Sequence, residues 1–266
     1  MNDKENSAKE FTRLLEIMDE LRDKCPWDKK QTNETLRKLT IEETYELADA
    51  IISGDDEAIR GELGDLMLHI AFYAKLGDEK GAFNMTDILK GICQKLIYRH
   101  PHVFGDIEVE SAKEVMENWE KLKSREQNGY RRVLSGVPDS LPATVKANRI
   151  QEKVAGVGFD WEQPEQVWDK VKEEYLELAK EIEDKNEERI ENEFGDLFFA
   201  LINASRLYGI DPEIALEKTN RRFIKRFNYL ESATIKKGRS LHDMTLAEMD
   251  EIWKEAKLLE NKEQTS

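Results

Sequence analysis

A block of helical sequence occurs twice in this chain of 266 residues, and this repeat limits the possible folds more than any other feature. Residues 42–51 read EETYELADAI and residues 173–182 read EEYLELAKEI, 131 positions further on. The same separation takes ELGDL (62–66) onto EFGDL (193–197) without a gap. Self-similarity of this kind indicates repeated structural units. Shorter matches follow at slightly different separations: QKLIYR (94–99) with RRFIKR (221–226), and WEKLK (119–123) with WKEAK (253–257).

The apolar residues of both copies follow a helical period. In 36–52 they fall largely on one side of a helix, and 59–76 reads as a second helix. A turn at 53–58 separates the two, with Asp55 and Asp56 as candidate N-caps. No stretch alternates in the manner of a strand, so the fold class is predicted to be all-α. Further helices are expected near 84–99, 111–124, 164–183, 187–208, 211–232 and 245–260.

Two segments interrupt the helical pattern. Residues 126–144 contain two glycines and two prolines and are the best candidate for a domain connection. We therefore expect domains at 1–125 and 146–266 with a linker at 126–145. A second loop, AGVGFDW (155–161), precedes the next helical pair.

Composition excludes several classes of protein. No apolar run approaches the roughly 20 residues that span a bilayer, and the polar N-terminus lacks the apolar core of a secretory signal, so we expect a cytoplasmic location. A net charge of −15 argues against binding to nucleic acid or anionic membranes, which requires a basic surface. Cys25 and Cys93 are far apart and are expected to be ordinary reduced thiols. The four histidines show no metal-binding spacing.

Four acidic residues in the first copy occupy mirror-related positions. Glu43 and Glu46 share one helix face, and Glu62 and Asp65 share a face of the next helix. If the helices form an antiparallel hairpin that turns at Gly54, these carboxylates pair at two levels, about 4.5 Å apart along the axis. The second copy repeats the arrangement around Lys185, with Glu174, Glu177, Glu193 and Asp196.

Carboxylates brought together without basic partners repel, and their pKa values rise unless a cation is bound. Ligands that offer only oxygen suit Mg²⁺ or Mn²⁺, and magnesium is commonly shared with the phosphates of a substrate. Gly64 and Gly195 stand between the acidic residues, where the missing side chain would let helices or a ligand approach closely. The alternative is a solvated acidic face, typical of a single ExxE. A di-iron bundle would normally carry Glu-x-x-His motifs, which this chain lacks.

Basic and aromatic residues follow at helical spacing. Arg222 and Arg226 lie four apart and can grip phosphate oxygens. Trp253 and Lys257 are also four apart and can stack on a base and contact phosphate. Alternatively, the arginines lie on a solvated face and the tryptophan in the core. The first copy has Lys95 with Arg99 and Trp119 with Lys123, and His69, which follows the acidic motif by one turn, is expected to be a packing residue.

These motifs together resemble the all-α nucleoside triphosphate pyrophosphohydrolases. The pattern EExxE, a short hairpin and ExxD carries the general resemblance, whereas CPWDKKQT (25–32), RHPHVFGD (99–106) and VGFDW (157–161) look like the MazG family in particular. The resemblance implies a four-helix-type unit in each half, a homodimer, and Mg²⁺-dependent hydrolysis of a nucleoside or deoxynucleoside triphosphate to the monophosphate and pyrophosphate. It implies a role in clearing unwanted nucleotides.

Carried over by motif, the resemblance assigns Mg²⁺ to Glu174, Glu177, Glu193 and Asp196, and the nucleotide to Arg222, Arg226, Trp253 and Lys257. A carboxylate not fully engaged by metal would accept the proton of the attacking water, and spacing leaves Glu173 and Glu174 both open. The first copy retains every acidic position, as a second, less certain site, but it has Lys95 in place of one arginine. A non-catalytic helical module that binds nucleotides or a protein partner is the alternative, and it predicts binding without release of pyrophosphate.

Overall fold

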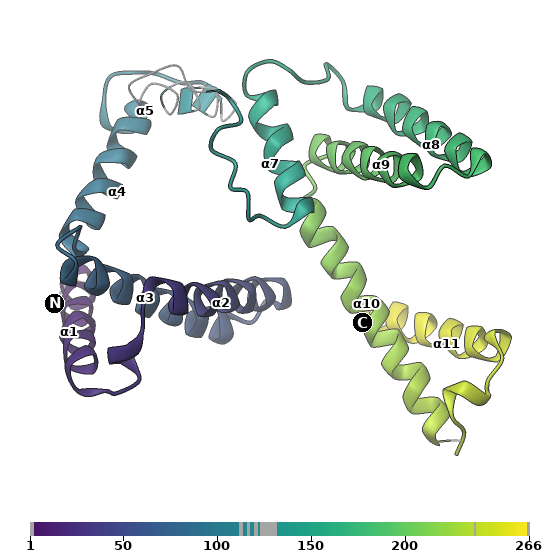
Figure 1. Ribbon diagram of the computed structural model, residues 1–266, viewed down its shortest axis with the longest axis horizontal. Helices are drawn as coiled ribbons and strands as arrows, with labels where there is room; N and C mark the ends of the chain where they lie inside the picture. The colour runs from purple at the N-terminus through teal and green to yellow at the C-terminus, as the bar shows by residue number, and fades with distance from the viewer. Residues whose placement is uncertain are drawn as a thin grey trace. The chain divides into compact units, whose positions relative to one another are not determined.

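The computed structural model describes residues 3–111, 114–115, 118–119, 122, 132–236 and 238–264. It divides into two compact units, Met1–Tyr130 and Arg131–Ser266, and the division falls inside the segment expected to connect them. Within the described residues every regular element is a helix, which confirms the predicted fold class (Figure 1). None of the helices described is both long enough and apolar enough to cross a membrane.

Unit 1 is built around an antiparallel hairpin of two long helices, α2 (Asn33–Ser53) and α3 (Asp56–Glu79) (Figure 1). Gly54 ends α2 in the left-handed region at φ 68°, which a glycine adopts without strain, so the predicted turn is confirmed. Asp55 then caps α3, its side chain accepting hydrogen bonds from the backbone N–H groups of Glu57 and Ala58. The other helices of this unit whose bounds lie within the described residues are α1 (Asp3–Lys24), η1 (Asp28–Lys30), α4 (Met85–Arg99) and α5 (Pro101–Phe104).

The core of unit 1 lies where α1 packs against the hairpin. Met18, Leu36, Phe72 and Leu76 form one buried apolar cluster, each at most 3% exposed. At its edge the guanidinium of Arg22 donates to both carboxylate oxygens of Glu79, which ties the end of α1 to the end of α3. The hairpin is therefore anchored at one end by a packed core.

Unit 2 repeats the same order of elements: a helix, a short 3₁₀ turn and a long antiparallel hairpin. Its hairpin consists of α8 (Val167–Asp184) and α9 (Glu187–Leu207), which lie side by side in Figure 1. Lys185 ends α8 at φ 52°, the left-handed conformation that Gly54 adopts at the matching position. The other elements are α7 (Ala143–Ala155), η2 (Pro164–Gln166), α10 (Pro212–Lys236), η3 (Leu241–Asp243) and α11 (Leu246–Gln264), with α11 packed along α10.

The helices predicted from apolar periodicity are confirmed wherever the structure describes them, apart from 111–124, most of which lies outside the described residues. The helices α1 and α7 were not among those predicted, and α7 begins at Ala143, inside the Gly- and Pro-containing segment 126–144 that was read as a connection. It nevertheless packs against α9 in the way that α1 packs against α3. The repeat therefore begins earlier in each half than the matching sequence blocks indicate.

Candidate metal centre

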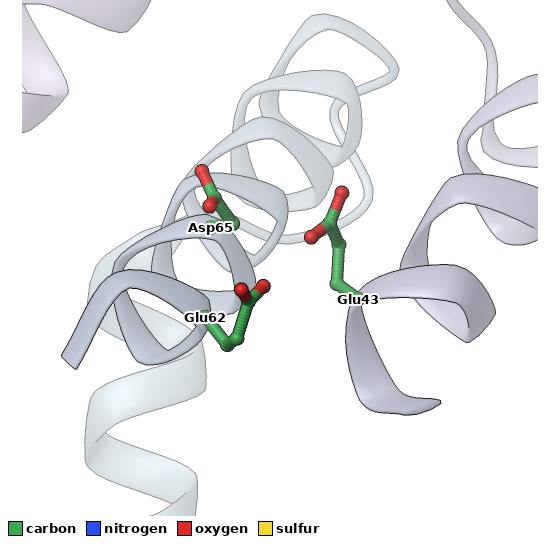
Figure 2. Close-up of side chains that lie close together, drawn as sticks. All are labelled: Glu43, Glu62 and Asp65. Carbon is green, nitrogen blue, oxygen red and sulfur yellow. The ribbon is translucent and has the colours of Figure 1, made fainter. Parts of the chain in front are cut away.

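The hairpin of unit 1 brings three carboxylates together at its centre. Glu43 points from α2 toward Glu62 and Asp65, which project from successive turns of α3 (Figure 2). One oxygen of each lies within 4.8 Å of the others. Glu43 and Glu62 are half-buried and Asp65 is exposed. Glu46, the fourth residue of the predicted set, lies exposed on α2 outside this close group.

The charges of the other three acidic residues nevertheless act on Glu43. Burial is the largest cause that raises the pKa of Glu43 above its usual value, and the negative charges of Asp65, Glu46 and Glu62 raise it further. A carboxyl group in this position is stabilised either by protonation or by a nearby cation.

The hairpin of unit 2 forms the corresponding cluster. Oxygens of Glu174, Glu177 and Glu193 lie within 4.8 Å of one another, and Asp196 is exposed just outside the close group. The pKa of Glu193 is raised by burial and then by the charges of Glu177, Asp196 and Glu174. The close group thus omits a different residue in each unit: Glu46 in unit 1 and Asp196 in unit 2. The first acidic residue of the motif on each helix, Glu43 and Glu62 in unit 1 or Glu174 and Glu193 in unit 2, belongs to the close group in both units.

A lysine in unit 2 corrects one expectation. The acidic cluster was predicted to lack basic partners, but Lys170 lies one turn before it on α8. Its Nζ is 2.7 Å from an oxygen of Glu174 and 2.8 Å from an oxygen of Glu173. These contacts raise the pKa of Lys170 and fix its positive charge beside the site. The matching position in unit 1 is Leu39, so only the second cluster has this counter-charge.

The two glycines are only partly explained by the structure. A Cβ placed on Gly64 or Gly195 would meet no atom of the described residues within 4 Å, so no helix described here approaches closely, and the alternative of a ligand stays a prediction. Both glycines are exposed beside the carboxylates. The space in front of them remains available to a ligand.

The four predicted nucleotide contacts lie on α10 and α11, and two of them meet. The guanidinium of Arg226 lies 5.9 Å from the ring centre of Trp253, and its Nε donates to Glu260 at 2.7 Å. Trp253 is half-buried against Phe223, with ring centres 5.0 Å apart. Arg222 is exposed and donates to the hydroxyl of its neighbour on the same helix, Thr219, and Lys257 is exposed on α11.

Three of these residues, Arg222, Arg226 and Trp253, thus have partners of their own within unit 2. Within the described part of the chain no hydrogen bond or ion pair joins these four side chains to the carboxylates on α8 and α9. In unit 1 the guanidinium of Arg99 lies 5.0 Å from the ring centre of Trp119, in the same way, whereas Lys123 lies outside the described residues.

His69 is a packing residue, as predicted. It is 7% exposed, burial lowers its pKa, and it lies outside the close carboxylate group of unit 1. Cys25 and Cys93 are both free thiols.

Comparison with known proteins identifies the architecture. The model of the MazG nucleotide pyrophosphohydrolase domain matches the chain twice, at residues 31–104 and 162–230, and each match contains one of the carboxylate clusters. The chain belongs to the MazG family.

Relatives that match nearly the whole of this chain support the family assignment. A nucleoside triphosphate pyrophosphohydrolase of Escherichia coli K12 is 42% identical over 93% of this chain and 97% of its own length. The nucleoside triphosphate pyrophosphohydrolase/pyrophosphatase MazG of Thermotoga maritima is 43% identical over 93% of this chain and 95% of its own length. YabN of Bacillus subtilis, named only as uncharacterized, is 44% identical over 95% of this chain and 53% of its own length. The tandem arrangement of two MazG units therefore spans nearly the whole of two relatives.

Proposed function

We propose that this MazG protein hydrolyses nucleoside triphosphates to the monophosphate and pyrophosphate with Mg²⁺ as cofactor, and that it serves to clear unwanted nucleotides. The observation that carries the proposal is the gathering of three carboxylates from two antiparallel helices, within 4.8 Å of one another, in each of the two units. The names of the full-length relatives support the reaction. Mn²⁺ is expected to substitute for Mg²⁺, since both prefer oxygen ligands.

The residues present fit a hard divalent cation. All the donors in the two clusters are carboxylates. Burial, and after it the charges of the neighbouring carboxylates, raises the pKa values of Glu43 and Glu193, and a cation would offset both effects. In unit 2 we assign the cation to Glu174, Glu177, Glu193 and Asp196. When bound, Mg²⁺ stabilises charge on the phosphates and lowers the pKa of a coordinated water.

Protein side chains supply the other requirements of the reaction. Lys170 places a positive charge at the edge of the cluster, where it can hold a phosphate oxygen. Glu174 belongs to the close group, whereas Glu173 is exposed and hydrogen-bonded to Lys170. Either of these two glutamates can accept the proton of the attacking water. If Glu173 is the base, Glu173→Gln should reduce turnover and leave Mn²⁺ binding unchanged. Glu174→Gln should reduce turnover and also weaken Mn²⁺ binding.

We further propose a homodimer in which Arg222, Arg226, Trp253 and Lys257 contact the nucleotide. Many large apolar side chains are exposed in unit 2, among them Leu176 on α8, Phe198 on α9 and Phe223 on α10, each more than half exposed. Large apolar side chains that gather into one exposed patch commonly mark a protein interface, and a dimer would cover these residues. A second copy that covers these faces would bring α10 and α11 of one subunit toward a hairpin of the other.

Product analysis tests the proposed reaction. Wild type, Glu43→Gln/Glu46→Gln and Glu174→Gln/Glu177→Gln would each be incubated with a panel of nucleoside triphosphates and Mg²⁺. Monophosphate and pyrophosphate are expected from wild type, and loss confined to the second double variant would place catalysis in unit 2. Nucleotide binding without turnover by wild type would refute the enzyme and favour the alternative of a binding module.

A further inference from the structure

Unit 2 contains a cavity that the metal centre does not use. It has a volume of about 380 Å³ and lies between α7, the loop that follows α7, and α9. Phe159, Trp161 and Phe199 supply aromatic walls, and Ile150 and Val154 supply aliphatic ones. A cavity of this size with mainly apolar walls is typical of a small-molecule site.

The polar groups of the cavity are held in place by a hydrogen-bond network. Arg206 forms an ion pair with Asp160 of the loop and donates through Nε and Nη2 to the Oδ1 of Asn203. Because Arg206 occupies the oxygen of Asn203, the amide group of that side chain has a fixed orientation at the cavity wall. This network connects the loop to α9 at the wall of the cavity.

Gln151 forms part of the inner wall and is only 3% exposed. Its Nε2 donates to the backbone carbonyl of Phe199 at 2.8 Å, which determines the orientation of the amide. Its Oε1 is then left buried with no hydrogen-bond partner among the described residues. A buried acceptor of this kind is costly unless a donor reaches it, so a ligand N–H at the inner wall would satisfy it.

The cavity lies on the same side of α9 as the carboxylates. Phe199 follows Asp196 by three residues and Asn203 follows it by seven, so the cavity begins about 5 Å and extends to about 10 Å beyond the acidic motif along the helix axis. The α-phosphate and the base of a nucleotide are separated by a comparable length. A phosphate chain held at the carboxylates would thus allow the base to reach the cavity.

Unit 1 fills the same place with a side chain. The residue that matches Asn203 in the first copy is Phe72, which is 2% exposed and packs with Met18, Leu36 and Leu76 in the core. The two hairpins share their turn conformation and their acidic spacing, so the difference lies in the side chains that face α1 or α7. Asn203 therefore stands in the second copy where the first copy has the buried ring of Phe72.

We propose that this cavity binds the base of the nucleotide substrate and that Gln151 accepts a hydrogen bond from an N–H group of that base. The inference rests on the proposed function and extends it: the ligand is a flat heteroaromatic ring that lies between aromatic walls, with its donor edge toward the inner wall. Stacking of the base on Trp253 instead is the competing arrangement, and the experiment distinguishes the two.

Two substitutions reduce the volume of the cavity by different means. Asn203→Phe introduces the residue of unit 1, and Val154→Phe fills the cavity from α7 while it leaves the Arg206 network intact. Both should lower kcat/KM for nucleoside triphosphates at least tenfold, chiefly through KM, and should leave Mn²⁺ binding in the absence of nucleotide unchanged. Val103→Phe, at an exposed position of α5, is the matched control and should keep the wild-type kcat/KM. Circular dichroism and the unfolding midpoint establish that each variant is folded.

The role of Gln151 is tested with substrate analogues that lack the donor. Wild type is expected to prefer ATP to purine riboside triphosphate, or CTP to its pyrimidin-2-one analogue, at least tenfold in kcat/KM. Gln151→Leu should abolish that preference. Wild-type turnover that neither filling variant changes, or that shows no such preference in either pair, would overturn the inference while leaving the proposed function in place. Absence of turnover by wild type with every nucleotide would instead refute the proposed function and, with it, the assignment of the cavity.

Discussion

Replacement of one carboxylate in the unit 1 cluster should stabilise the metal-free protein and at the same time remove most of the stabilisation that metal gives to unit 1. Glu43 lies within 4.8 Å of oxygens of both Glu62 and Asp65. Two unit charges at that separation repel by about 1 kcal/mol in a water-like dielectric and by about 3.5 kcal/mol at an effective dielectric constant of 20. Because these side chains are half-buried or exposed, the lower value applies, and Glu43→Gln should raise the free energy of unfolding without metal by about 1–2 kcal/mol.

The order of stability should reverse when Mg²⁺ is added. A ligand that binds only the folded state stabilises it by about 2.7 kcal/mol at a concentration one hundred times its dissociation constant. Wild type should gain this amount at the unit 1 site, whereas Glu43→Gln lacks one of the three close ligands and should gain much less. Calorimetric unfolding in EDTA and in excess Mg²⁺ measures both differences, and Glu16→Gln, an exposed glutamate on α1, controls for the loss of one negative charge.

The dependence on pH has a definite sign. The pKa of Glu43 is raised in the folded protein, so the repulsion is absent below the usual glutamate pKa and develops as pH rises through the raised value. The excess stability of metal-free Glu43→Gln should therefore be full at neutral pH and vanish near pH 4. A metal-free variant less stable than wild type at pH 7, or an equal gain from Mg²⁺ in both proteins, would refute the reasoning.

Three further measurements test other parts of the structure. Phe72→Ala should lower the free energy of unfolding of unit 1 by about 3–5 kcal/mol, since the ring is 2% exposed in the core, and denaturant titration checks this. Lys170→Leu should increase Mn²⁺ affinity at the second cluster, because the lysine competes with metal for Glu174, and an equal or weaker affinity in isothermal titration would contradict that reading. Glu248→Gln should lower the unfolding midpoint of unit 2 near pH 7, and the difference should disappear as pH falls from about 4.5 toward 2, because Arg239 holds the pKa of Glu248 at about 2.

Short-range pattern was enough to predict most of the fold. Apolar periodicity located the helices of both hairpins and α4, α10 and α11, although not α1 or α7, and the mirror-related acidic residues correctly placed the turn of each hairpin at Gly54 and Lys185. This was possible because the position of the turn decides which residues of an antiparallel helix pair lie at the same level along the axis, and the internal repeat supplied an independent check on that position. The same geometry brought Glu43 close to Glu62 and Glu174 close to Glu193.

Features that depend on side-chain length and on a third helix could not be predicted in this way. Whether Glu46 or Asp65 joins the close group is decided by rotamers and by slight differences in helix packing, not by spacing. Lys170 stands outside the repeated acidic block, and its contact with Glu174 became visible only in the structure. The cavity beside Asn203 depends on α7, which the sequence pattern did not reveal.

The two copies provide a comparison within one chain, because their hairpins have the same turn and the same acidic spacing. What differs is the surroundings of the acidic residues: Leu39 in unit 1 stands where Lys170 does in unit 2, and Phe72 stands where Asn203 does. Both differences place charge or polar space in unit 2 where unit 1 has an apolar side chain. A cation needs only the carboxylates that the copies share, whereas a phosphate chain and a base need a positive charge and an open cavity. Both units are therefore expected to bind metal, and the second unit is expected to recognise the nucleotide.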